Sequence, residues 1–411
     1  MYNFNINQLS DNIIYNIFIC MCFKNRNKFS TYNKKLYNKY NKYNHPEIIK
    51  INYSQHKLIN KWKNIKFEMD LSSSKKRNLS KLSNIYSLNL SNYKYKINTS
   101  YLKKITILNL NNCKKIKNVS LLKNIYNLNL SNCDLVEDIS DLGNVHTLNL
   151  EGCDLVKDIS NLGNIHTLNL ERCYLIEDVS NLDNVKILNL YDCYKIKNIS
   201  NLGNLFYLDL SCCDIDDVSM LGNIKTLILG ECVKITDVSM LGNVKNLDLN
   251  GCTGITDVSM LKNVYDLNLS GCEGITDITM LNNVYKLNLS WCVNIKNISG
   301  LDNLNTFIKH SDKNLTSAHG LEHVKNIDLT DAYELVDISM LQCVVRLNLA
   351  DCEKIIDIPY LEMLEEIDLN FCIGLTDISN LIFVESIYYS PKMCNFDTEN
   401  YNIIDYCMED M

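Results

Sequence analysis

A unit of 20 residues recurs along most of this chain, and it constrains the fold more than any other feature. The apolar-x-apolar centre of the unit returns in fourteen clear copies, at Leu88, Leu108, Leu128, Leu148, Leu168, Leu188, Leu208, Leu227, Leu247, Leu267, Leu287, Ile327, Leu347 and Ile367. Degenerate copies lie at Phe307 and Ile387. A fixed period of this length predicts a solenoid, in which each unit buries its apolar face against its neighbours.

One copy shows how a unit is expected to fold. In the segment 145–150, Leu148 and Leu150 alternate with polar residues, which predicts a short strand with one buried face. Cys153 then turns inward, and Leu155 or Val156, followed by Ile159, should fill the coil. The returning arm is too short for a full α-helix. We therefore expect a convex side of turns and single 3-10 turns, and a shallow, twisted arc.

The consensus L-x-x-L-x-L-x-x-C-x-x-I-x-D-V-S resembles the leucine-rich repeat, and the resemblance covers about three quarters of the chain. It implies an α/β repeat solenoid with short parallel strands on the concave face. We expect about 16 repeats over residues 82–389. Residues 46–81 would form a linker and N-terminal cap, and residues 390–411 a C-terminal cap and acidic tail.

Twelve of the 18 cysteines occupy one position of the repeat: Cys113, Cys133, Cys153, Cys173, Cys193, Cys213, Cys232, Cys252, Cys272, Cys292, Cys352 and Cys372. One cysteine per repeat at a fixed packing position indicates buried thiols, because such a thiol behaves as a small hydrophobe with a weak donor. Free thiols favour a reducing compartment, and we expect a cytoplasmic protein. The ladder lacks C-x-x-C pairs, so no metal site is predicted.

Polar residues mark the turns of each unit. The Asp-Val-Ser steps at 237–239 and 257–259 predict an Asx turn, in which the aspartate accepts a hydrogen bond from the backbone two residues on. Asparagines before the next strand, such as Asn144 and Asn164, are expected at left-handed corners.

The first 66 residues contain no repeat and differ in charge. They hold 12 Lys+Arg against Asp11 and Glu47, a balance of +10 in a chain of net charge −7. An apolar stripe with the spacing of one helical face runs through Leu9, Ile13, Ile14, Ile17, Phe18 and Met21, behind a capping pair, Ser10 and Asp11. Residues 1–45 resemble an F-box, although Ser10 replaces the usual proline and the closing tryptophan is absent.

An F-box-like helical module followed by these repeats resembles the F-box/leucine-rich-repeat proteins, most closely those of giant DNA viruses. The resemblance implies a substrate-recognition subunit of a cullin–RING ubiquitin ligase, monomeric apart from that complex and located in host cytoplasm if the chain is viral. The apolar stripe would bind a Skp-family adaptor, and the repeats would bind a protein substrate. One alternative is a binding scaffold without a ubiquitin link, whose N-terminus only caps the solenoid. In a weaker alternative, the basic N-terminus holds nucleic acid or a membrane.

Variation between repeats on the concave face indicates where a partner binds. Asparagine or aspartate recurs between the two apolar strand residues, for example at Asn149 and Asn169, and is expected to stabilise the sheet by amide bonds along its axis. The variable positions beside it carry the predicted substrate-binding residues, most of them of types enriched at interface hot spots: Tyr126, His146, His166, Phe206, Tyr207, Tyr265, Tyr285, Trp291 and Arg346. Lys186, Lys225 and Lys245 stand among them.

Two repeats depart from the pattern. Lys309 replaces an inward leucine and Asp312 replaces the cysteine, so we expect a local bulge or a lysine that extends to solvent, at a kink, a ligand contact or a decayed repeat. The copy between Leu210 and Leu229 is one residue short and should tighten a turn. No phosphate loop, nucleophile elbow or metalloprotease helix is present. The sequence therefore predicts no enzyme activity, no cofactor and no small-molecule substrate.

Overall fold

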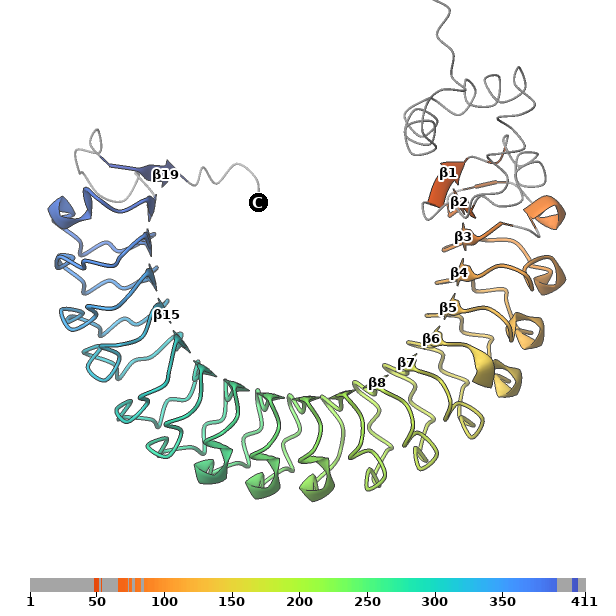
Figure 1. Cartoon of the computed structure of the whole chain (residues 1–411), viewed down its shortest axis with the longest axis horizontal. Coiled ribbons are helices and arrows are strands. Elements are labelled where there is room, and N and C mark those ends of the chain that lie inside the picture. The colour runs from red at the N-terminus through yellow and green to blue at the C-terminus, as the bar shows by residue number, and fades with distance from the viewer. Residues whose placement is uncertain are drawn as a thin grey trace, which may run out of the picture.

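The computed structural model describes residues 48–51, 53, 66–72, 74–75, 78–82, 85–389 and 401–405. The F-box-like segment at residues 1–45, with the predicted adaptor-binding residues, lies outside this range. The described residues form one parallel sheet of 19 strands, wound so that each strand pairs with the next one in the chain (Figure 1). The predicted parallel-strand repeat solenoid is confirmed.

The sheet begins before the repeats and ends after them. It starts with β1 (Ile48–Ile51) and β2 (Lys66–Asp70) and finishes with β19 (Ile403–Asp405). Between them lie sixteen repeat strands: β3 (Ser87–Asn89), β4 (Ile107–Asn109), β5 (Asn127–Asn129), β6 (Thr147–Asn149), β7 (Thr167–Asn169), β8 (Ile187–Asn189), β9 (Tyr207–Asp209), β10 (Thr226–Ile228), β11 (Asn246–Asp248), β12 (Asp266–Asn268), β13 (Lys286–Asn288), β14 (Thr306–Ile308), β15 (Asn326–Asp328), β16 (Arg346–Asn348), β17 (Glu366–Asp368) and β18 (Ser386–Tyr389).

The convex side consists of turns and short 3-10 helices, as predicted. The 3-10 helices are η3 (Ser80–Leu82), η4 (Thr99–Tyr101), η5 (Ser120–Leu122), η6 (Ser140–Asn144), η7 (Ser219–Leu221), η8 (Ser239–Leu241), η9 (Ser259–Leu261) and η10 (Ser379–Leu381). The predicted Asx turns precede them: the backbone N–H of Ser239 donates to Asp237 Oδ1 at 2.9 Å. In the described residues, no helix has the length and apolarity that crossing a bilayer requires.

Each repeat buries the same few side chains. In one unit Leu148, Leu150, Cys153 and Val156 are at most 1% exposed, whereas Leu155 is 41% exposed. Val156, not Leu155, therefore fills the coil. The core continues without interruption through all repeats, as expected of units that bury their apolar faces only against neighbours.

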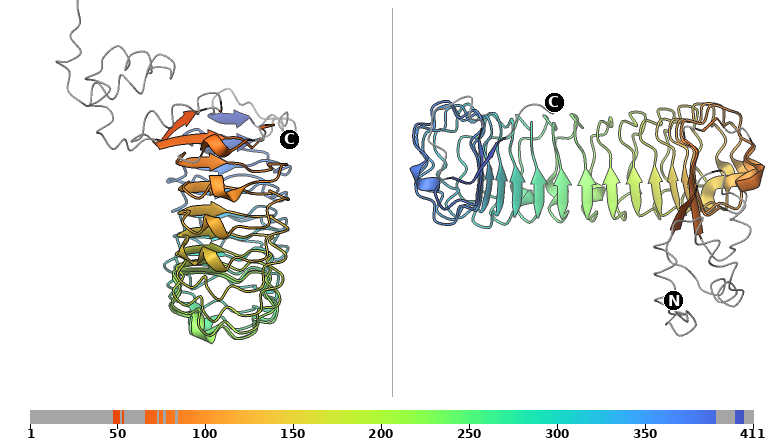
Figure 2. Two further views of the ribbon diagram at one scale, coloured as in Figure 1. Left: turned by 90° about the vertical axis from the view of Figure 1, so that its right-hand side faces the viewer. Right: turned by 90° about the horizontal axis from the view of Figure 1, so that it is seen from above.

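The arc is deeper than predicted. Figure 1 shows an open horseshoe in which β1 and β19 lie on opposite arms, and Figure 2 shows that it stays close to one plane. The bonding differs between the two sides. On the concave side repeats bond to each other, as where Leu150 N–H donates to Asn169 O at 2.8 Å. The convex turns bond mainly within their own repeats, as from Leu162 N–H to Ile159 O, and fewer backbone bonds join one repeat to the next, such as that from Ala318 N–H to Asp337 O. The convex arms can therefore spread further apart than the strands.

The left-handed corner lies elsewhere than predicted. Asn144 and Asn164 do not adopt positive φ. The residue before the cysteine position does, in repeat after repeat, for example Asn132 (φ 56°) and Gly152 (φ 62°). At this corner the chain reverses directly from the strand into the coil, and asparagine or glycine suits the conformation best.

The asparagine positions on the concave face also act differently from the prediction. Asn149 Oδ1 accepts a hydrogen bond from the backbone N–H of Glu151 at 2.8 Å, and Asn169 does the same for Glu171 at 2.9 Å. These are Asx turns within one repeat. Bonds along the axis occur at few positions, such as Asn268 to Asp248 at 3.1 Å. The side chains mainly shape the end of each strand.

The cysteines form a ladder of buried thiols. All twelve cysteines at the repeat position are free and buried. Each donates to a leucine carbonyl of the preceding repeat, as Cys153 Sγ does to Leu130 O at 3.2 Å. Burial raises the pKa of the Cys153 thiol to about 12. The thiols are therefore packing groups that also bond neighbouring repeats.

The repeat that holds Lys309 is regular, contrary to both expectations. Strand β14 keeps its register with β13 and β15, and Lys309 is 1% exposed. Its Nζ lies 3.1 Å from Asp312 Oδ2 and donates to the carbonyl of Cys292 at 3.2 Å. The two substitutions therefore compensate each other, because the aspartate that replaces the cysteine neutralises the lysine that replaces the leucine.

The short repeat loses a turn. In regular units the residue three after the cysteine donates a backbone hydrogen bond to it, as Ile196 N–H does to Cys193 O. In the short repeat Ile215 follows Cys213 by only two residues, so this turn is missing. Strand pairing is unaffected, with Leu208 opposite Leu227. Asp214, in the shortened loop, pairs with Lys197 and Lys234 from the flanking repeats.

Candidate protein-binding surface

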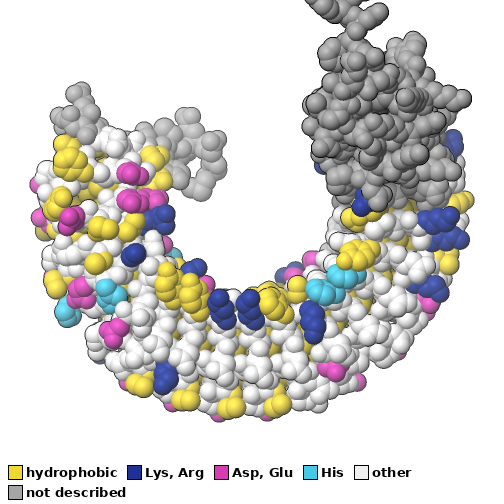
Figure 3. Space-filling model, in the orientation of Figure 1, with side chains coloured by type: hydrophobic (Ala, Val, Ile, Leu, Met, Phe, Trp, Pro, Cys, Tyr) yellow, Lys and Arg dark blue, Asp and Glu magenta, His cyan; other side chains and the backbone are white. Residues whose placement is uncertain are grey.

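A row of hydrophobic, histidine and basic side chains follows the floor of the horseshoe (Figure 3). Each occupies the position just before a repeat strand, so the solenoid places them side by side along one edge of the concave face. We call this row the edge ladder; it consists of Tyr126, His146, His166, Lys186, Phe206, Lys225, Lys245, Tyr265 and Tyr285. Six of these nine are predicted substrate-binding residues.

The rings of the edge ladder stack on one another. Tyr126 lies 4.4 Å from His146, which lies 4.7 Å from His166, with interplanar angles of 14° and 10°. Tyr265 and Tyr285 stack in the same way at 4.8 Å. Because the rings stack along the solenoid axis, their faces cover each other and their edges are directed toward the hollow.

The lysines of the edge ladder extend the stacks. Lys225 Nζ lies 4.6 Å from the ring centre of Phe206, and Lys245 Nζ lies 5.0 Å from that of Tyr265. These are cation–π contacts, which hold an ammonium group at the ring without neutralising it. Tyr126 is 54% exposed, Phe206 50% and Tyr265 40%. The ladder is therefore ordered by its own contacts and remains accessible.

The other three predicted residues lie off the ladder. Tyr207 is the first residue of β9 and is partly buried, and burial raises its pKa. Trp291 lies on the far side of its strand at a left-handed corner (φ 64°) and is 58% exposed. Arg346 begins β16 in the C-terminal part of the array. The structure thus brings six predicted residues into one row and leaves three at separate places.

The opposite edge of the concave face is acidic over the same repeats. Glu151, Glu171, Asp209 and Asp248 lie at or just after the strand ends and are partly buried. Burial and the charge of Glu151 raise the pKa of Glu171, whose carboxylate lies 3.4 Å from Arg172. The concave face therefore has two edges of opposite charge.

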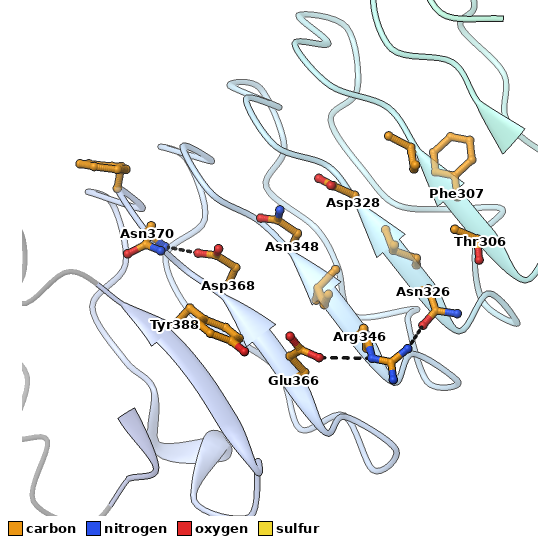
Figure 4. Close-up of a pocket in the computed structure, with 14 residues that line it drawn as sticks. Thr306, Phe307, Asn326, Asp328, Arg346, Asn348, Glu366, Asp368, Asn370 and Tyr388 are labelled. Atoms are coloured by element: carbon orange, nitrogen blue, oxygen red, sulfur yellow. Dashed lines mark hydrogen bonds and ion pairs between the residues drawn. The ribbon is translucent and has the colours of Figure 1, made fainter. Parts of the chain in front are cut away.

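A second feature is a hollow of about 700 Å³ across β14–β18. Arg346 spans its floor, with Nε 3.2 Å from Glu366 Oε2 and Nη1 3.3 Å from Asn326 Oδ1 (Figure 4). Asp328, Asp368 and Tyr388 also line it. Burial raises the pKa of Asp368, and the charge of Asp328 adds to the effect. The hollow is lined mainly by apolar side chains, such as Phe307 and Phe371, with the carboxylates of Asp328 and Asp368 among them.

The sequence interpretation found only Arg346 among the residues of this hollow. The missed ones include Ile308, Asp328, Glu366, Asp368 and Tyr388. One signal was present: Ile308 and Tyr388 interrupt the asparagine and aspartate positions of the strands. Their grouping depends on the curvature, which the sequence reasoning underestimated.

Comparisons with known proteins identify the type of fold. No protein-family model matches the chain, and no curated protein matches it. Among solved structures, TLR13 in its complex with ssRNA13 is similar, with 16% identity, 89% of this chain and 64% of that chain covered, and a TM-score of 0.50. The fold is that of a leucine-rich-repeat solenoid. This chain spans less than two thirds of the TLR13 chain.

Two further solved structures are similar to this leucine-rich-repeat array. Internalin InlF from Listeria monocytogenes has 21% identity, with 70% of this chain and 81% of that chain covered and a TM-score of 0.44. The functional domain of InlJ from Listeria monocytogenes, which includes a cysteine ladder, has 19% identity, 62% and 65% coverage and a TM-score of 0.39.

Within the described ranges, no three histidine, cysteine, aspartate or glutamate side chains converge on a possible metal position. His310 Nε2 lies 3.0 Å from Oδ1 of Asp328, which lines the hollow. The Asp328 carboxylate, as hydrogen-bond acceptor and as a negative charge, raises the pKa of His310.

Proposed function

We propose that this chain is a non-enzymatic scaffold that binds a protein on the concave face of its repeats. The observation that carries the proposal is the edge ladder, an accessible row of aromatic and basic side chains across nine consecutive repeats. Tyrosine, tryptophan and arginine are the residue types that dominate interface energetics. A surface this long and open suits a macromolecule better than a small ligand, which prefers an enclosed pocket.

The proposal includes a role for the N-terminal segment. The apolar stripe from Leu9 to Met21 and its capping pair resemble an F-box, which supports docking on a Skp-family adaptor of a cullin–RING ligase. The chain would then raise the local concentration of a bound substrate near the ubiquitin-conjugating enzyme without performing chemistry. This role places it in the cytoplasm, the host cytoplasm if the chain is viral.

The concave face is tested by removing stacked rings. Tyr265→Ala with Tyr285→Ala should reduce the recovery of a protein partner from a cytosolic lysate by about tenfold or more, since hot-spot truncations cost about 2 kcal/mol each. Met220→Ala with Met260→Ala removes exposed side chains from the convex turns and serves as the control. Equal recovery by both variants would place the binding site off the concave edge.

The adaptor role is tested with the full-length chain. Wild type should recover a Skp-family adaptor and cullin from a eukaryotic cytosolic lysate, and Ile17→Asp with Phe18→Asp should abolish the recovery. Val233→Asp with Met240→Asp adds the same charge at exposed positions of the array and should recover the adaptor normally. If wild type recovers no adaptor while it still captures its partner, the chain is a plain binding scaffold and the ubiquitin link fails.

A further inference from the structure

The edge ladder differs from the rest of the array in charge. Residues 67–411 carry 29 Lys+Arg against 46 Asp+Glu, yet the nine ladder positions hold Lys186, Lys225, Lys245 and no acidic residue. Lys286, which directly follows Tyr285, is by contrast paired with Asp266 at 3.6 Å. Among the described residues, no carboxylate lies within ion-pair distance of the three ladder lysines, so they present uncompensated positive charge to the hollow.

The orientation of the aromatic rings adds to the positive electrostatic character of the edge ladder. Each stacked ring covers the face of its neighbour, so the ladder directs ring edges toward the hollow. The edge of an aromatic ring carries the positive end of its quadrupole, and the face the negative end. Ammonium groups, imidazole rings and aromatic edges therefore all favour an anionic ligand at this edge.

The opposite edge restricts the shape of that ligand. Glu151, Glu171, Asp209 and Asp248 lie across the same strands, less than about 20 Å away at ~3.3 Å per residue. A polyanion of uniform charge that filled the concave face would meet these carboxylates. A protein segment avoids the conflict, because alternate side chains of an extended chain lie on opposite faces and differ freely in charge.

We propose, building on the protein-binding role above, that the edge ladder binds an acidic protein segment in an extended conformation, with its carboxylates toward Lys186, Lys225 and Lys245. Ring centres repeat every 4.4–4.8 Å along the ladder. Eight such intervals span roughly 37 Å, which an extended chain covers with about a dozen residues. Acidic residues at every second position of that segment face the ladder together.

The test uses a defined probe and the full-length chain. The probe is a fluorescent dodecapeptide of alternating glutamate and threonine, measured by anisotropy. The tested variant is Lys186→Ala with Lys225→Ala and Lys245→Ala. The control variant is Lys157→Ala with Lys262→Ala and Lys296→Ala, which removes the same charge from exposed positions elsewhere in the array.

The inference predicts that the ladder variant weakens peptide binding by about tenfold, which is about 1.4 kcal/mol shared among three exposed charge pairs. The control variant should bind like wild type. Binding should weaken as NaCl rises from about 50 to about 500 mM, because added salt screens exposed charges. Equal losses in the two variants, or no binding by wild type, would overturn the inference.

Two further probes separate the alternatives. A lysine–threonine peptide of the same length should not bind in a manner that depends on the ladder. An oligouridylate of twelve nucleotides tests nucleic acid; if it binds as tightly as the acidic peptide and needs the same lysines, the protein-segment assignment is wrong. The inference can fail while the proposed function stands. If the variant without the three ladder lysines still captures the partner that Tyr265→Ala with Tyr285→Ala loses, the scaffold role stands and the acidic-segment inference falls.

Discussion

Two neighbouring repeats share one strand register and differ at two buried positions. One holds Lys309 and Asp312, and the repeat before it holds Leu289 and Cys292 at the same places. The regular repeat fills them with a leucine and a thiol, and the atypical repeat with an ion pair that is almost fully buried. Positions inside the coil thus change in compensating pairs. Positions on the edge ladder change one at a time, from tyrosine to histidine to lysine, without disturbing the sheet. The side chains that determine binding specificity can therefore vary on the edge ladder while the buried core stays constant.

Removing one partner of the buried ion pair should have the largest effect on stability. Asp312→Ala leaves the Lys309 ammonium buried without a counterion, which should lower the free energy of unfolding by about 3–5 kcal/mol. Chemical denaturation measures the loss. Asp302→Ala removes an exposed carboxylate nearby and should change stability by less than about 0.5 kcal/mol. A small loss in Asp312→Ala would mean that the lysine reaches solvent after all.

Replacing both Lys309 and Asp312 by the residues of a regular repeat should leave the free energy of unfolding unchanged or raise it. Lys309→Leu with Asp312→Cys recreates the pair found in the preceding repeat and avoids the desolvation of two charges. Replacement of a buried ion pair by packed apolar groups is neutral or stabilises by about 1–4 kcal/mol. Denaturation of this double variant beside each single variant measures the coupling. A double variant as unstable as Asp312→Ala would show that the backbone here, not the pair, is specialised.

The regular repeats should depend on each thiol only modestly. Cys272→Ala removes a buried sulfur that donates to Leu249 O, and should cost about 1–2 kcal/mol of unfolding free energy. Cys343→Ala, at an exposed position, should cost almost nothing.

The same thiols should resist alkylation. Burial raises the pKa of Cys133 and Cys153 to about 12, so little thiolate forms at pH 8. Among the described cysteines, Cys343 should react first with iodoacetamide, as mapped by mass spectrometry. Rapid alkylation of Cys133 or Cys153, or a large drop in thermal stability with reductant, would contradict a ladder of free buried thiols.

The smallest expected effect concerns His310, which follows Lys309 and has no titrating equivalent at Ser290 or Thr330. Its folded pKa is raised by Asp328, so the contact stabilises fully below the unfolded pKa of about 6.5 and is lost as pH rises through the folded value. His310→Asn should therefore lower Tm more at pH 6 than at pH 8.5, by under about 2 °C. Ser290→Ala should show the same Tm change at both pH values, and a larger His310 effect at the higher pH would refute the assignment.

The repeat predicted most of the fold because a single unit determines strand, turn and core together. Leu148, Leu150 and Cys153 are buried as their spacing indicates. The deep arc was not predictable, because curvature depends on how far the convex turns spread and no single unit contains that information. The predicted bulge or solvent-exposed lysine at Lys309 is wrong, because the ammonium is buried beside a carboxylate that neutralises it. Asp312, three residues later at another inward position, was the signal for a buried pair.

For the candidate site, the sequence predicted which repeat positions lie together but not the contacts between their side chains. The shared period placed Tyr126, His146 and His166 on one edge, and Phe206, Tyr265 and Tyr285 with them. The stacking distances and the cation–π contacts with Phe206 and Tyr265 required the structure. Trp291 and Arg346 share no row with these residues, because each occupies a different position of its repeat.

Site-specific photo-crosslinking shows directly whether the concave edge ladder holds the protein partner. Benzoylphenylalanine would replace Phe206 or Tyr265 on the ladder, and Met240 or Met260 on the convex turns, where exposure is at least as great. We expect both ladder positions to crosslink to one acidic segment of the same protein, and the convex positions not to crosslink. Equal or stronger crosslinking from Met240 and Met260 would contradict it.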